Sequence, residues 1–142
     1  MSLDARVYVH RDKLPIDVDD LRAYVEEETG EVFFDDPSAI PRELELVALD
    51  KRLGNVSMVH WLVKQIKDVL GSGSLLLGKV LYNGSHSGDW IGQADLGRLR
   101  EEIASVWNLT EGHRSVDLDR FLEDLRELTK AAEEQGDPIV FV

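Results

Sequence analysis

The last quarter of the chain constrains the fold most, because it joins a long amphipathic segment to a short and wholly apolar one. Apolar residues recur through 117–135 at intervals of three and four, which is the spacing of one face of an α-helix. Gly136 and Pro138 follow as a pair that typically ends a helix. Residues 139–142, Ile-Val-Phe-Val, are then apolar without interruption, and a segment of this kind is normally paired within a sheet. The sequence therefore predicts a helix over 117–135 and a buried C-terminal strand over 139–142.

Three other segments have the apolar spacing of helices. The clearest is 55–70, where Asn55 is a residue type that caps a helix N-terminus well. Segments 95–108 and 17–29 follow the same pattern, and each begins at an aspartate suited to the cap position. We therefore expect about four helices in all.

Four further segments are predicted to be strands, because they are short, apolar or alternating, and bounded by turn residues. Segment 43–53 fits both a strand period and a helix period, and we assign it as a strand. These segments are 5–10, 31–35, 43–53 and 75–82.

Together these assignments predict one α+β domain over residues 1–142. Its mixed β-sheet would be covered by about four helices, and the C-terminal strand would be paired in the sheet. A chain of 142 residues is long enough for one substantial core. Residues 1–3 resemble a cloning remnant and are given no role in this prediction.

Charge and composition exclude several classes of function. The formal net charge is -12, and residues 1–50 account for -9 of it, with 14 acidic and 5 basic side chains. So acidic a surface repels phosphate backbones and anionic membranes, and we expect neither nucleic acid nor membrane as a partner. A cationic partner would be attracted, although an acidic surface also serves simple solubility. The absence of cysteine excludes disulfides and thiolate chemistry and fits a reducing compartment.

The segment 80–92, V-L-Y-N-G-S-H-S-G-D-W-I-G, is the strongest candidate for a functional loop. Its closely spaced glycines allow close backbone approach, but it matches neither a phosphate-binding loop nor a nucleophile elbow. His86 and Asp89 are spaced so that one could orient the other as a base, with Ser85 or Ser87 as a nucleophile. A turn held by local hydrogen bonds from the same side chains explains the pattern more simply, because three catalytic groups adjacent in sequence rarely meet at one atom. Trp90, together with Tyr82, is either a core aromatic or an anchor of a contact surface.

Metal and cofactor sites are not predicted. The four histidines never occur at the H-x-x-x-H or H-E-x-x-H spacing of common metal sites. We therefore expect neither a bound metal ion nor another cofactor.

Three quoted segments carry a resemblance to a known family. They are L-D-K-R-L-G-N-V-S-M-V-H-W-L (49–62), K-V-L-Y-N-G-S-H-S-G-D-W-I (79–91), and R-F-L-E-D-L-R-E-L-T-K-A-A with G-D-P-I-V-F (120–132 and 136–141). The chain over about 44–142 resembles a small family of bacterial immunity proteins from polymorphic-toxin systems, whose members share an L-Y-S/N-G-x-H-S-G-D core. The H-S-G-D core is the specific part of the resemblance, and residues 1–43 are not covered by it.

The resemblance implies a cytoplasmic protein that neutralises a toxin domain by protein–protein contact, with no catalytic residues to carry over. The acidic balance then suits a cationic toxin. The alternative is a small enzyme or ligand-binding domain that uses Ser85, His86 and Asp89 in the Gly84 to Gly92 loop. The oligomeric state stays open, a homodimer included. The residues predicted to contact a partner are Glu31, Asp35, Asp36, Ser85, His86, Ser87, Asp89 and Trp90.

Overall fold

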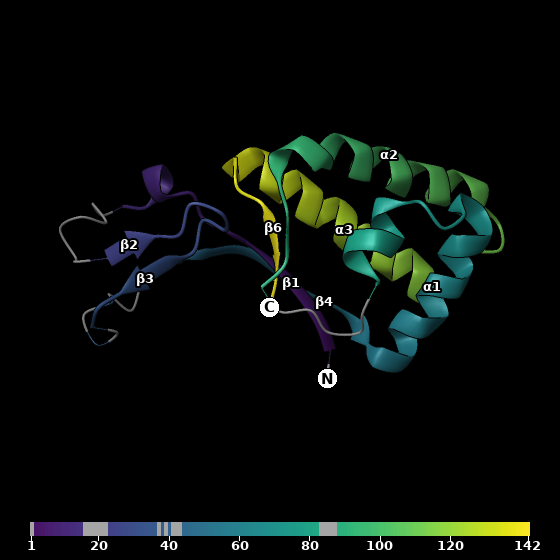
Figure 1. Cartoon of the computed structure of the whole chain (residues 1–142), viewed down its shortest axis with the longest axis horizontal. Coiled ribbons are helices and arrows are strands. Elements are labelled where there is room, and N and C mark those ends of the chain that lie inside the picture. The colour runs from purple at the N-terminus through teal and green to yellow at the C-terminus, as the bar shows by residue number, and fades with distance from the viewer. Residues whose placement is uncertain (1, 16–22, 37, 39, 41–43, 83–87) are drawn as a thin grey trace.

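A sheet and three long helices dominate the computed structural model of the chain (Figure 1), which describes residues 2–15, 23–36, 38, 40, 44–82 and 88–142. The strands are β1 (Ser2–Tyr8), β2 (Ala23–Val25), β3 (Val32–Phe34), β4 (Val47–Asn55), β5 (Trp90–Ile91) and β6 (Ile139–Phe141). The long helices are α1 (Val56–Leu70), α2 (Gln93–Leu109) and α3 (Val116–Gln135), and short helical turns are η1 (Arg11–Lys13) and η4 (Leu76–Val80). The main sheet has the strand order β4-β1-β6-β5, and β2 and β3 form a separate hairpin.

The predicted α+β class is confirmed, and so is the pairing of the C-terminal strand. β6 lies between β1 and β5, with Phe141 opposite Ala5 and Ile139 opposite Ile91. The sequence predicts a mixed sheet under about four helices. In the part of the chain that the structure describes, the paired strands are all antiparallel and three long helices are present.

The core lies between the sheet and the helices, which are grouped on one side of the sheet (Figure 1). On β1, Leu3, Ala5 and Val7 alternate toward the helices and are buried, while Arg6 faces the other way and pairs with Asp50 of β4 at 3.2 Å. This alternation is the pattern of a strand with one buried face. The helices complete the core with the stripes that the sequence predicts, and α3 alone contributes Leu118, Phe121, Leu122, Leu125, Leu128 and Ala132.

The helix predicted over 17–29 is wrong in the part that the structure describes; residues 17–22 lie outside that part. Residues 23–25 form β2, which is paired with β3, and residues 27–29 form the turn between them. So short an apolar segment fits both the helix period and the strand period, so packing decides which structure it forms. The inward side chains of both strands pack near Leu14 in a second, smaller apolar cluster, which a helix could not complete while also pairing with β3.

The strand predicted over 75–82 is also wrong, because η4 is a single π-helical turn. Glu102 of α2 supplies the reason. Its two carboxylate oxygens accept the backbone N–H groups of Leu75 and Leu76, each at 3.0 Å. A carboxylate at the start of a helical turn satisfies donors that the turn itself leaves without a partner.

The boundaries of the remaining helices are close to the prediction. Asn55 caps α1 as expected, and its side chain accepts a backbone N–H at 2.8 Å. α2 begins two residues before Asp95, with Gly92 at the cap position. α3 is capped by Ser115 rather than by Asp117.

The predicted strands other than 75–82 are confirmed with shifted ends. β1 begins at Ser2 rather than at residue 5, and Leu3 is buried, so residues 2 and 3 belong to the fold. β4 covers most of the predicted 43–53 strand, whose first residue lies outside the described part of the chain.

Candidate functional site

The structure divides the predicted contact residues between two surfaces. Asp89 and Trp90 lie at β5, on the edge of the main sheet. Glu31, Asp35 and Asp36 flank β3 in the hairpin, which projects from the far end of β1 and β4, away from the three long helices (Figure 1). A partner can therefore meet the molecule at either of two distinct places.

Backbone hydrogen bonds hold the sheet-edge residues in position. The N–H of Gly88 donates to the carbonyl of Phe141 at 2.8 Å, and the N–H of Phe141 donates to the carbonyl of Asp89 at 2.8 Å. Trp90 is then paired with Val140 across the β5–β6 ladder. Asp89 and Trp90 are thus presented on paired backbone rather than on a free loop, which fixes the direction of their side chains.

Aromatic side chains are prominent on this surface, which we term the edge surface (Lys79, Tyr82, Asp89 and Trp90). The hydroxyl of Tyr82 donates a hydrogen bond to the Asp89 carboxylate, which raises the pKa of the Tyr82 phenol because the bond favours its protonated form. Tyr82 is 51% exposed and Trp90 42%, and a hollow of about 400 Å³ is lined by the edge surface and Gly78. Large aromatic side chains half in water are typical of contact surfaces.

A second hollow continues the edge surface onto α1. It has a volume of about 470 Å³, and Tyr82 lines both hollows. Its basic lining residues are His60 and Lys67, and no carboxylate is among the described residues that line it. The edge surface and its extension therefore suit apolar contact more than electrostatic attraction. The apolar residues of the extension are Val56, Val59, Val63, Leu77 and Leu81.

The hairpin, by contrast, is intensely acidic. Residues 23–36 contain six acidic side chains and no basic one, which equals half of the formal net charge of -12. We term this segment the acidic hairpin. Its carboxylates belong to Glu26, Glu27, Glu28, Glu31, Asp35 and Asp36.

An aromatic pair lies on the outer face of the acidic hairpin. Tyr24 of β2 is directly opposite Phe33 of β3, and their rings are stacked with centroids 5.1 Å apart and planes 16° apart. Tyr24 is 60% exposed. The neighbouring side chains of Val25 and Val32 point inward to the small cluster with Leu14, as strand alternation requires. One face of the hairpin thus packs against the rest of the fold, and the opposite face carries the aromatic stack, with Tyr24 exposed.

Two of the predicted acidic residues also have local structural partners. Glu31 lies close to Tyr8 at the end of β1; burial raises the pKa of the Tyr8 phenol, and the nearby Glu31 carboxylate adds to that rise. The Asp36 carboxylate accepts the hydroxyl of Ser38 at 2.7 Å and its N–H at 3.0 Å, and these bonds lower the pKa of Asp36. Asp35 and Asp36 are exposed to solvent. Glu31 is therefore turned toward the end of β1, while Asp35 and Asp36 are available to a partner.

Asp137, directly after α3, fastens the turn of the hairpin to the rest of the molecule. Its side chain is 10% exposed, and one carboxylate oxygen lies 3.2 Å from Nδ1 of His10. The backbone of Gly30, at the end of the hairpin turn, passes so close that a β-carbon there would be 2.9 Å from the carboxyl carbon of Asp137. Gly30 also has a φ of +79°, in the left-handed region. The position therefore needs glycine for two independent reasons.

Replacing Gly30 with alanine is expected to lower the free energy of unfolding by about 2–4 kcal/mol, the sum of left-handed backbone strain and overlap with Asp137. The matched control is Gly112→Ala, where φ is +86° but nothing lies within 4 Å of the added β-carbon. The control should lose only the backbone part, about 1–2 kcal/mol. Urea denaturation of both variants measures the difference, and equal losses would contradict the close approach to Asp137.

The catalytic alternative rests on residues that the structure places only in part. Ser85, His86 and Ser87 lie outside the described residues. Asp89, the remaining member of that alternative, uses its carboxylate to accept the Tyr82 hydroxyl. Within the described ranges, no group of three or more histidine, aspartate or glutamate side chains is placed to hold a metal ion. Across the same ranges, no helix has both the length and the apolar character needed to cross a membrane.

Comparison of the chain with models of known protein families, with curated proteins and with solved structures gives no match. Its function is therefore inferred from its own surfaces.

The sequence does not predict the stack of Tyr24 and Phe33, because Tyr24 lies within the segment 17–29 that is predicted to be a helix. A signal was present. The triplets Ala-Tyr-Val and Val-Phe-Phe flank an acidic turn that ends at Gly30, and antiparallel pairing across that turn brings the two rings together.

Proposed function

We propose that this chain is an immunity-type protein that binds a cationic toxin domain and neutralises it by protein–protein contact. The observation that carries the proposal is the acidic hairpin, which holds six carboxylates and a stacked aromatic pair whose Tyr24 ring is exposed. Carboxylates clustered on one projection attract a cationic partner over long range and speed its encounter. The aromatic stack of Tyr24 and Phe33 then offers a rigid, desolvatable anchor for short-range affinity.

The edge surface supports the proposal as a second contact. Tyr82, Asp89 and Trp90 belong to the segment that resembles the immunity family, and Tyr82 and Trp90 are the exposed aromatic side chains beside its two hollows. Aromatic residues held on rigid backbone are common interface anchors. Neutralisation by covering the toxin needs no catalytic group, and it would take place in the cytoplasm, where the toxin would otherwise act.

The test measures binding of the purified chain to the domain encoded by the gene immediately upstream, at low and high salt. We expect the association rate to fall about tenfold or more between roughly 50 and 500 mM salt, because the Debye length shortens and steering is screened. Neutralising the exposed carboxylates of the hairpin should lower the low-salt association rate by about tenfold. The variant combines Glu27→Gln, Glu28→Gln, Asp35→Asn and Asp36→Asn.

A matched control neutralises the same number of exposed acidic residues on other elements. Its net charge therefore equals that of the hairpin variant. The control combines Asp68→Asn, Glu101→Gln, Glu111→Gln and Asp117→Asn. If the control slows association as much as the hairpin variant does, the net charge acts rather than the hairpin. Tyr24→Ala should instead raise the dissociation rate. Absence of binding, together with no protection of cells that express the upstream domain, would refute the immunity proposal.

A further inference from the structure

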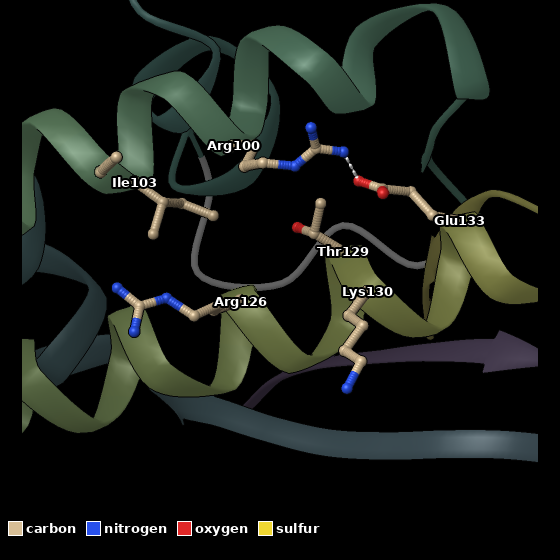
Figure 2. A pocket seen from close by; sticks show the side chains of 7 residues that line it. Arg100, Ile103, Arg126, Thr129, Lys130 and Glu133 are labelled. Carbon is tan, nitrogen blue, oxygen red and sulfur yellow. Dashed lines mark hydrogen bonds and ion pairs between the residues drawn. The ribbon is translucent and has the colours of Figure 1, made fainter.

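A groove between α2 and α3 differs in character from both proposed contact surfaces (Figure 2). Its volume is about 260 Å³. Ile103 of α2 and Thr129 of α3 reach into the space between the helices, and Ala104 completes an apolar floor. The hydroxyl of Thr129 is already used, since it donates to the carbonyl of Leu125 at 2.7 Å. The floor therefore offers a ligand mainly apolar contact.

The side chains around this floor are mostly basic, whereas the molecule as a whole is acidic. The chain has 28 acidic and 16 basic side chains, yet three basic residues and one acidic residue line the groove. Arg100 is paired with Glu133 across the two helices, as the dashed line in Figure 2 marks, so these two charges neutralise each other. Lys130 extends away from α2 in the same view. Arg126 is thus the cation best placed to meet a ligand.

The guanidinium of Arg126 is held by an aromatic ring. No carboxylate among the described residues accepts a hydrogen bond from it. Its guanidinium carbon lies 4.7 Å from the centroid of the Trp107 ring, which is also stacked by Arg114 at 3.6 Å. Among the described residues, its ion pair is with Glu123 at 3.9 Å, too long for a hydrogen bond. Figure 2 shows the guanidinium beside Ile103. Stacking fixes the plane of an arginine and leaves its N–H donors free for a carboxylate, which they can bind in bidentate fashion.

We propose that this groove binds a small free carboxylic acid with an apolar body. The carboxylate accepts hydrogen bonds from Arg126, and the body lies on the floor of Ile103, Ala104 and Thr129. The volume is below the range of about 300–1,000 Å³ that holds drug-sized ligands, so the acid is a fragment-sized one. A small polar anion would leave the floor in water, and a neutral or cationic compound would lack the charged contact. This site is independent of toxin binding.

The test uses 3-phenylpropanoate as the probe and follows backbone amide shifts by NMR on the whole chain. We expect saturable shift changes concentrated at residues 100–104 and 126–133. Two comparison compounds test separately whether the carboxylate and the apolar group are needed. 3-Phenylpropanamide keeps the apolar group without the charge, and acetate keeps the charge without the apolar group. Each should bind at least about tenfold more weakly than the acid.

Variants then test the assigned contacts. Arg126→Gln should weaken binding of 3-phenylpropanoate by about fivefold or more, in line with one partly exposed charge pair. Arg120→Gln, on the same helix but outside the groove, removes an equal charge and should leave binding unchanged. Ala104→Leu fills the exposed part of the groove and should abolish saturation without touching any charge. Equal binding of the acid and its amide, equal losses in both arginine variants, or shifts that do not saturate would each overturn the proposal.

Discussion

Truncating Phe141 to alanine is expected to lower the free energy of unfolding by about 3–5 kcal/mol, the usual cost of deleting a fully buried aromatic ring. Phe141 is 1% exposed and lies on β6, opposite Ala5 of β1 and on the face that meets the helices. Its removal leaves a cavity where the sheet and the helical layer join. A total stability of about 5–15 kcal/mol is normal for such a domain, so the loss is a large fraction of the whole.

Urea denaturation measures this loss, with Val116→Ala as the control. Val116 is apolar too but 83% exposed, and its truncation should change stability by no more than about 0.5 kcal/mol. The two variants separate buried packing from the simple removal of apolar atoms. A loss below about 1 kcal/mol for Phe141→Ala would show that the C-terminal strand contributes little to the core, against the observed pairing of β6.

Replacing Glu102 with alanine is expected to lower the free energy of unfolding by about 2–6 kcal/mol. The carboxylate is 12% exposed, and its two oxygens each accept one backbone N–H, from Leu75 and Leu76. Its loss leaves two donors in a largely buried place without a partner, at about 1–3 kcal/mol each. Glu102→Gln keeps one acceptor oxygen and should fall between the wild type and the alanine variant.

Hydrogen exchange at the amides of Leu75 and Leu76 gives the local readout for this prediction. Both should lose protection in Glu102→Ala by more than the global destabilisation explains, because the helical turn η4 loses its cap. Glu101→Ala is the matched control, since Glu101 is an exposed neighbour on the same helix. Unchanged protection at both amides would show that another group satisfies them and that Glu102 is dispensable.

The acidic hairpin shows how far a site can be predicted from composition. The excess of carboxylates before residue 51 is plain in the sequence, and it predicts Glu31, Asp35 and Asp36 as contact residues. What composition does not reveal is that the same hairpin also carries a stacked ring pair. Tyr24 and Phe33 become neighbours only because β2 and β3 pair in antiparallel register. The partition of contact residues between hairpin and sheet edge likewise depends on topology.

Local sequence signals suffice to predict the elements whose pattern is long or locally complete. The stripes of α1, α2 and α3 repeat over four or more turns, Asn55 and Gly136 mark helix ends with their own backbone and side chains, and β6 is too apolar to stay in water. The net charge likewise follows from the composition alone. These features need no knowledge of distant residues.

The conformation of the short segments depends on contacts with residues far away in the chain. Residues 23–25 became a strand because β3 and Leu14 complete their packing, and residues 76–80 became a helical turn because Glu102, 26 residues from Leu76, satisfies its first N–H groups. Gly30 is required because Asp137 lies against it. A segment of three to five residues gains too little from its own hydrogen bonds to fix its conformation, so the free energy of contacts with distant residues makes the choice.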